Sequence, residues 1–227
     1  MIAYIIDNKE NNPKYKSFNC ATNQPHLSQR NNEVTPSWTC NTTSMCMGLT
    51  YAGWTLPKGQ YERAADNLTY FCQHDQRVLD YYNEVDPTNY EKWLTDPDNN
   101  YAPNEVHAVL SYATNLWMGK TCTYWNGETS LTDICSDLRK GLPVILSAKF
   151  GTLNHIVCAT GLKYLSNDNT YANPQRLIYN DPWGLTYYYN DWNYSCDGNE
   201  IEWSKVLSDI KPVNSSVKWS HRFYKPQ

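Results

Sequence analysis

The chain has 227 residues, which is long enough for one globular domain to bury a core of its own. Its formal net charge of −4 comes from 19 Lys plus Arg and 23 Asp plus Glu, mixed along the sequence, and the lack of a basic stripe argues against a nucleic-acid partner. No segment is apolar over the length that crossing a bilayer requires, so no membrane span is expected.

The first dozen residues, MIAYIIDNKENN, contain a short apolar run that is broken by Asp7 and Lys9. The run has neither a basic start nor a small-residue cleavage site, so it predicts a first strand rather than a secretory signal. We therefore expect a protein that is made in the cytosol with its thiols reduced.

The cysteines do not indicate a metal site. They are eight in number and lie without a close Cys-x-x-Cys pair, at positions 20, 40, 46, 72, 122, 135, 158 and 196. Because structural zinc and redox sites rely on such pairs, we expect no metal and no other cofactor. Whether any of the eight form disulfides stays open.

The first half of the chain has a helical pattern. Residues 8–39 are polar, include three Pro, and are expected to be mostly loop. Apolar residues at near-helical spacing then predict helices around 41–53 and across roughly 58–82. The stretch DPTNYEKWLTDPDNNYAP is rich in helix breakers and is expected to interrupt them.

Two further helices are expected before the character of the sequence changes. Pro103 marks the start of one that runs to about Met118. After a turn at Trp-Asn-Gly, Ser130 is expected to cap a helix through Arg139 that stops at Gly141.

The second half is rich in β-branched and aromatic residues. Strands are predicted at LPVILSAKF, HIVCATGLKY and RLIYNDPW, residues 142–150, 155–164 and 176–183, and aromatic runs at 185–189 and 217–224 are candidates for more. Helices followed by an antiparallel sheet predict an α+β fold in which a helical half faces the sheet across a cleft.

Cys40 stands at the entrance to the first helical pattern, in TPSWTCNTTSMCMGL. A buried cysteine usually packs as a small hydrophobe, and Cys46 fits that interpretation. Cys40 fits it less well, because the first N–H groups of a helix lack intrahelical partners and the helix dipole favours a negative charge there. We therefore expect Cys40 to be a reactive thiol.

Two later residues complete a possible catalytic set. His155 precedes an apolar strand, and Asp181 ends another, directly before Pro182. Taken singly, each has an ordinary structural interpretation: the imidazole satisfies a backbone group, and the Asp forms a turn. Taken with Cys40, they supply a nucleophile, a base and a carboxylate that orients the base, although Asn180 is an alternative partner for the histidine.

An acyl-transfer site also needs donors for an oxyanion. The backbone N–H of Cys40 is one candidate, and the Gln29 amide in the preceding loop is the second. Gln24, Asn31 and Asn32 compete with Gln29 for this role.

The segments SQRNNEVTPSWTCNTTSMCMGL, GLPVIL, NHIVCATGL and YNDPWG, which span roughly residues 28–184, resemble a known family. They are similar to the double-glycine-leader (bacteriocin-processing) peptidases and their relatives, a branch of papain-fold cysteine peptidases of bacteria and phages. Matched residue by residue, the resemblance implies that Cys40 is the nucleophile, His155 the general base, Asp181 its orienting partner and Gln29 the oxyanion donor. Asn41 stands where many relatives have Gly.

The resemblance also implies an organisation and a substrate. It makes residues 1–227 a single papain-like peptidase domain, with a nucleophile loop and helix at 28–54, a helical insertion at 55–128 and a β-sheet half at 141–227. Its phage-like character suggests a monomeric, endolysin-like peptidase that cleaves peptidoglycan peptides in the host cytoplasm, in the cell wall or after release. The substrate-binding residues expected beside the catalytic ones are Trp38, Asn41, Asn154 and Trp183.

Two functions of other classes stay open at this point. One is a catalytically inactive papain-like module that binds a protein partner, and the other is a structural or virion protein whose aromatic residues stabilise assembly. The scissile bond, and the choice between hydrolysis and transpeptidation, also stay open.

Overall fold

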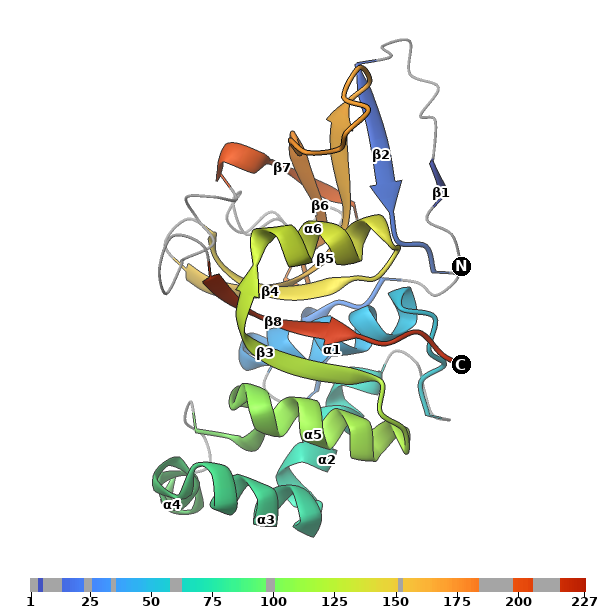
Figure 1. Cartoon of the computed structure of the whole chain (residues 1–227). Coiled ribbons are helices and arrows are strands. Elements are labelled where there is room, and N and C mark those ends of the chain that lie inside the picture. Colours follow the sequence, from blue (N-terminus) through green and yellow to red (C-terminus); the bar gives the residue numbers. More distant parts are fainter. Residues whose placement is uncertain are drawn as a thin grey trace.

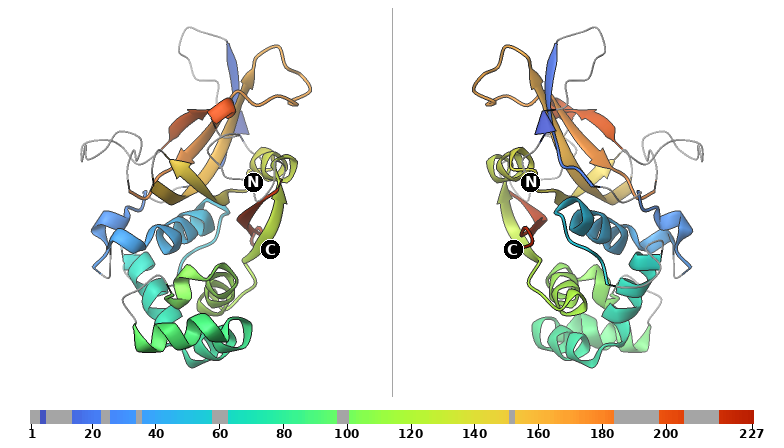
Figure 2. Two further views of the ribbon diagram at one scale, coloured as in Figure 1. Left: turned by 90° about the vertical axis from the view of Figure 1, so that its left-hand side faces the viewer. Right: turned by 90° about the vertical axis from the view of Figure 1, so that its right-hand side faces the viewer.

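The structure, a computed structural model, describes residues 4–5, 14–22, 26–33, 36–57, 63–96, 101–150, 153–183, 198–205 and 217–227. Figure 1 shows most of the helices gathered beneath a twisted sheet, and the side views in Figure 2 show the same arrangement. None of the described helices is both long and apolar enough to cross a bilayer.

The sheet contains eight described strands, and every pairing between them is antiparallel. The order is β1-β2-β5-β4-β8-β3, and β6 also pairs with β5 and then with β7. The strands are β1 (Tyr4–Ile5), β2 (Tyr15–Asn19), β3 (Thr123–Ser130), β4 (Val144–Phe150), β5 (Leu153–Leu165), β6 (Arg176–Asn180), β7 (Asn199–Glu202) and β8 (Val217–Phe223).

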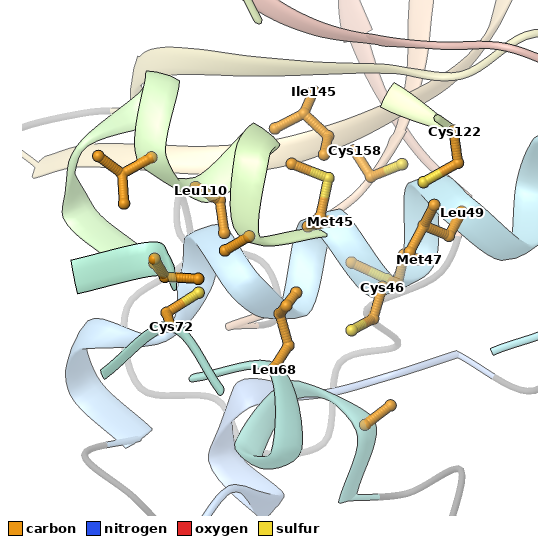
Figure 3. Close-up of a cluster of buried hydrophobic side chains, with 14 of the residues drawn as sticks. Met45, Cys46, Met47, Leu49, Leu68, Cys72, Leu110, Cys122, Ile145 and Cys158 are labelled. Atoms are coloured by element: carbon orange, nitrogen blue, oxygen red, sulfur yellow. The ribbon is translucent and has the colours of Figure 1, made fainter. Parts of the chain in front are cut away.

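Helices cover both faces of this sheet (Figure 1). The α-helices are α1 (Cys40–Tyr51), α2 (Ala64–His74), α3 (Gln76–Val85), α4 (Pro87–Thr95), α5 (His107–Met118) and α6 (Leu131–Arg139), and the 3₁₀ turns include η1 (Gln29–Asn31), η2 (Pro36–Trp38) and η4 (Pro103–Glu105). Helix α1 packs between the sheet and the group α2–α5, in the core shown in Figure 3. Helix α6 packs on the opposite face, in a second core.

Successive side chains of a strand point to opposite faces of the sheet, and this alternation explains why there are two cores. On β4, Ile145 points into the α1 core, whereas Val144 and Leu146 point into the α6 core. Ile145 also pairs with Cys158 of β5, which lies in the same core (Figure 3). The apolar run that predicted a strand here therefore has both of its faces covered.

Helix α1 is buried on every side from Asn41 to Thr50, although its sequence is rich in Asn, Thr and Ser. Its polar side chains stay buried because they are hydrogen-bonded: Thr42 Oγ1 lies 2.9 Å from Thr69 Oγ1, for example. Gly48 permits β8 to approach closely, since a Cβ there would lie 2.3 Å from the Phe223 ring. The helix therefore sits at a fixed depth against the sheet.

Two helix predictions need correction. The helix expected across 58–82 is two helices, because Asp75 adopts an extended backbone that ends α2, while its carboxylate caps α3 at Arg77 N. The breaker-rich stretch contains α4, because Pro87 stands in its first turn, where a missing N–H costs nothing, and Asp86 caps it.

The strand predictions also need correction. The loop expected over 8–39 contains β2, whose pairing with β5 outweighs its polar composition. The expected Trp-Asn-Gly turn lies inside β3, where Trp125 and Asn126 pair with β8 and the register shifts between Asn126 and Thr129, so a bulge stands in place of the turn. Strand β7 was not predicted, and residues 185–189 lie outside the described part.

The other predicted elements are confirmed. Tyr4–Ile5 form the described part of the expected first strand, and α1 and α6 lie where helices were predicted. Helix α5 ends at Met118 as predicted, but it begins at His107, because Pro103–Glu105 form the separate turn η4 and Val106 is extended. Strands β4, β5, β6 and β8 match predicted strands. The protein therefore has the α+β architecture that the sequence predicted.

Candidate active site

Cys40 is the first residue of α1, as the sequence predicted, and its side chain is partly exposed. The other described cysteines are buried and none is in a disulfide, while Cys196 lies outside the described residues. Burial raises the pKa of each of those buried thiols, for instance that of Cys135 to about 11. Among the described cysteines, Cys40 is therefore the one placed to react.

His155 lies on β5 and Asp181 directly follows β6, so the pairing of the two strands brings the side chains together. His155 Nε2 lies 2.7 Å from Asp181 Oδ1, and both residues are buried. The Cys40 thiol hydrogen-bonds the same imidazole. Because Nε2 is engaged by Asp181, we assign Nδ1 as the ring nitrogen that faces the thiol.

The charge of this imidazole is set by its partners. Burial alone would lower the pKa of His155, but the hydrogen bonds and charges of Asp181 and Cys40 outweigh it and raise the pKa to about 10. The site therefore favours an imidazolium at neutral pH, held between a carboxylate and a sulfur atom.

Asp181, and not Asn180, is the partner of the histidine. The Asn180 amide donates to Tyr51 Oη at 2.8 Å and accepts from Gly198 N at 2.9 Å, so it is engaged elsewhere. Asp181 Oδ1 also accepts the Trp183 N–H at 2.8 Å, which holds the carboxylate beside the imidazole.

A hydroxyl of α1 fixes the helix against the histidine strand. Ser44 lies one turn after Cys40, and its Oγ donates to the carbonyl of Ile156, next to His155, at 3.1 Å. The sequence analysis did not identify Ser44, because a serine inside a helical pattern does not show which strand it will meet.

The loop that carries Gln29 is tied to the turn that carries Asp181. Gln29 N and Ser28 Oγ both donate to Pro182 O, at 2.9 and 3.2 Å, and the guanidinium of Arg30 lies over the Trp183 ring at 5.2 Å. The same loop reaches the start of α1, because Asn32 Nδ2 donates to Thr39 Oγ1 at 2.7 Å.

The Gln29 amide has a defined orientation. Its Nε2 donates to Pro36 O at 2.7 Å, and since a carbonyl only accepts, the nitrogen must face it. Nε2 keeps a second N–H, whereas the buried Oε1 accepts nothing from the described residues. Of its competitors, Asn32 is bound to Thr39, Asn31 is exposed and Gln24 lies outside the described residues.

The expected substrate-binding residues differ in how exposed they are. Trp38 ends η2 two residues before Cys40 and is 55% exposed, and Trp183 is partly exposed. Asn41 is buried, and its Nδ2 donates to Asn104 O at 2.7 Å, so its amide serves the protein interior. The side chain of Asn154 lies outside the described part.

The comparisons with known proteins name one family. The sequence matches the model of the Peptidase_C39 like family over residues 21–207, a range that contains Gln29, Cys40, His155 and Asp181. The chain belongs to this family. Membership supports a cysteine peptidase with an α+β, papain-like fold, and the arrangement of helices and antiparallel sheet agrees with it. No curated protein and no solved structure matches the chain significantly.

Proposed function

We propose that the protein hydrolyses peptide bonds by a Cys-His-Asp mechanism and acts on the peptides of bacterial peptidoglycan. The observation that carries the mechanism is the imidazole of His155, which hydrogen-bonds the Cys40 thiol and, through Nε2, Asp181 at 2.7 Å. The thiol contacts the imidazole, and the imidazole contacts the carboxylate. Nucleophilic acyl transfer requires these groups in this order.

In the first half of the proposed reaction, the Cys40 thiolate attacks the peptide carbonyl and a C–S bond forms. The negative charge that moves onto the carbonyl oxygen is held by the Cys40 N–H and the second N–H of Gln29 Nε2. The His155 imidazolium then gives its proton to the leaving nitrogen, the C–N bond breaks, and the amine departs from a thioester on Cys40.

In the second half, water attacks the thioester while His155 takes its proton. The C–S bond breaks, and the carboxylic acid product leaves with Cys40 restored. Asp181 orients the ring and stabilises the imidazolium in both halves.

The peptidoglycan substrate is supported by the resemblance of the site segments to phage and bacterial peptidases and by the exposed Trp38 beside the nucleophile. An indole there offers a flat apolar platform with one hydrogen-bond donor, which suits a glycopeptide. The same proposal includes a monomer that reaches the cell wall from the host cytoplasm or after release.

The test digests purified peptidoglycan and a mixed peptide library and identifies new amino termini by mass spectrometry. Wild-type protein is expected to release defined fragments from both, and Cys40→Ala from neither. Cys135→Ala is the matched control, because it removes a thiol on α6 in the other core. Cleavage by Cys40→Ala at the wild-type rate would exclude the mechanism.

The remaining outcomes separate the parts of the proposal. If wild-type protein cuts library peptides but leaves peptidoglycan intact, the reaction stands and the substrate is wrong. If neither is cut while iodoacetamide still labels Cys40 at pH 6, the protein is a binding module that retains a reactive thiol.

A further inference from the structure

A carboxyl group that the proposed mechanism does not use lies beside the start of α1. Glu105 ends η4, and its Oε1 accepts hydrogen bonds from Asn41 Nδ2 at 2.9 Å and from Asn104 Nδ2 at 3.2 Å. Asn41 directly follows Cys40. The two amides therefore hold this carboxyl in one orientation, one residue along the helix from the nucleophile.

The second oxygen of Glu105 has no partner among the described residues. Oε2 makes no hydrogen bond within the described part of the chain, and the residue as a whole is partly exposed. The result is a carboxyl with one oxygen fixed by protein and the other available to a ligand.

Glu105 forms no ion pair within the described part of the chain. Helix α1, which packs against it, contains no Lys, Arg or His, and His107 at the start of α5 is held neutral because burial lowers its pKa to about 4. Carboxylates that are withdrawn from water are normally paired with a cation. Glu105 is an oriented carboxylate near a nucleophile, and no protein cation within the described part of the chain is paired with it. A bound ligand is therefore the natural source of the positive charge.

The titration of the group agrees with this interpretation. Burial raises the pKa of Glu105 to about 7, against the opposing effect of the Asn41 hydrogen bond. A positively charged ligand would stabilise the ionised form and relieve the cost of burial.

We propose that Glu105 is a specificity-determining residue that binds a cationic nitrogen of the substrate, a side-chain ammonium or a free amino terminus, close to the scissile bond. The ammonium donates to Oε2 in a charge-assisted hydrogen bond, while Asn41 and Asn104 keep the carboxylate oriented. The inference rests on the proposed peptidase function and assigns the charge of its substrate.

The first test uses pairs of peptides that differ only in whether one amine is free or acetylated, with the amine moved along the sequence. At pH 8, wild-type protein is expected to favour the free amine by about tenfold in kcat/KM at one position. Glu105→Gln keeps an acceptor for the two amides and removes the charge, so the ratio should fall to near one. Glu91→Gln, an exposed residue on α4 with the same charge change, should keep the wild-type ratio.

The second test needs no cleavage. Cys40 is labelled at pH 8 with a cationic and an anionic methanethiosulfonate of similar size, and the adduct at Cys40 is measured by peptide mass spectrometry. The cation-to-anion ratio of labelling rates should fall about fivefold in Glu105→Gln, and Glu91→Gln should leave it unchanged. A ratio that Glu105→Gln does not alter would overturn the inference.

The two tests keep the inference and the proposed function apart. Wild-type protein that cuts peptides without any preference for a free amine refutes the role of Glu105 and leaves the peptidase intact. Protein that cuts nothing, but shows the Glu105-dependent labelling ratio, refutes the peptidase and supports a cation-binding carboxylate beside Cys40.

Discussion

Two buried histidine sites at the sheet have opposite charge preferences: one favours a charged imidazole and the other favours neutral imidazoles. The pKa of His155, between Asp181 and Cys40, is raised to about 10. On β8, burial lowers the pKa of His221 well below its usual value, and burial lowers that of its neighbour His107 to about 4. All three imidazoles are largely withdrawn from water, so burial does not explain the difference.

The partners explain it. His107 Nδ1 lies 3.2 Å from His221 Nε2, and Ser111 Oγ lies 2.8 Å from His221 Nδ1, while the His107 ring packs on Trp219 at 3.8 Å. These contacts are satisfied by neutral rings and offer no negative charge. A carboxylate is what turns a buried imidazole into a stable cation, so the comparison identifies Asp181 as the decisive group of the proposed site.

The largest effect is therefore expected for Asp181→Asn, which makes the surroundings of His155 resemble the neutral cluster. Peptidase activity should fall by about 10⁴-fold, because the ring loses its orientation and the support for its positive charge. Alkylation of Cys40 by iodoacetamide at pH 6 should slow in parallel, as followed by mass spectrometry.

Asp137→Asn is the matched control for this experiment. It neutralises another buried carboxylate, which lies on α6 and pairs with Arg222 of β8 at 2.6 Å. Its activity should stay within a few-fold of wild type once folding is verified by circular dichroism. Retention of a tenth or more of wild-type activity by Asp181→Asn would show that the carboxylate does not set the charge of the ring.

The pH dependence of stability tests the comparison directly. The pKa of His155 is raised on folding, so its contribution is fully present below about pH 6.5 and is lost as the pH rises towards 10. The pKa of His107 is lowered, so its contribution is present above about pH 6.5 and is lost as the pH falls towards 4. The two clusters should weaken the fold at opposite ends of the pH range.

Urea unfolding at pH 4.5, 6.5 and 9 measures both limbs. His107→Gln should flatten the acid limb by on the order of 3 kcal/mol, the value of a shift from about 6.5 to about 4. His155→Gln should flatten only the alkaline limb. An acid limb that is the same in wild type and His107→Gln would contradict a neutral, buried imidazole pair.

The sequence was sufficient to predict the residues of the proposed site because each occupies a recognisable local position. Cys40 starts a helix, His155 lies at the start of an apolar strand, and Asp181 precedes a proline. The pairing of β5 with β6 then brings the last two together, as adjacent antiparallel strands require.

The neutral cluster could not be predicted in the same way. His107 and His221 are more than a hundred residues apart, on elements that meet only when β8 enters the sheet beside β4 and β3. Glu105 was covered by the prediction of a helix start, and its contact with Asn41 depends on how η4 packs against α1. Side-chain networks between distant elements leave no periodic signal in the sequence.

The smallest expected effect concerns how each histidine strand is held by a serine of a neighbouring helix. Ser44 of α1 donates to the carbonyl of Ile156, beside His155, whereas Ser111 of α5 hydrogen-bonds His221 itself. Ser44→Ala and Ser111→Ala should each cost about 1 kcal/mol in the free energy of unfolding, because each removes one buried hydrogen bond.

Activity should distinguish these two variants although their stabilities do not. Ser44→Ala frees the start of α1 to shift against β5, so kcat should fall by about tenfold with little change in KM, since small displacements of reacting groups are costly. Ser111→Ala disturbs only the neutral cluster and should leave kcat within twofold. Equal kcat values for the two variants would mean that the Ser44 contact does not position Cys40, and that the rest of α1, buried from Asn41 to Thr50, holds the nucleophile in place by packing alone.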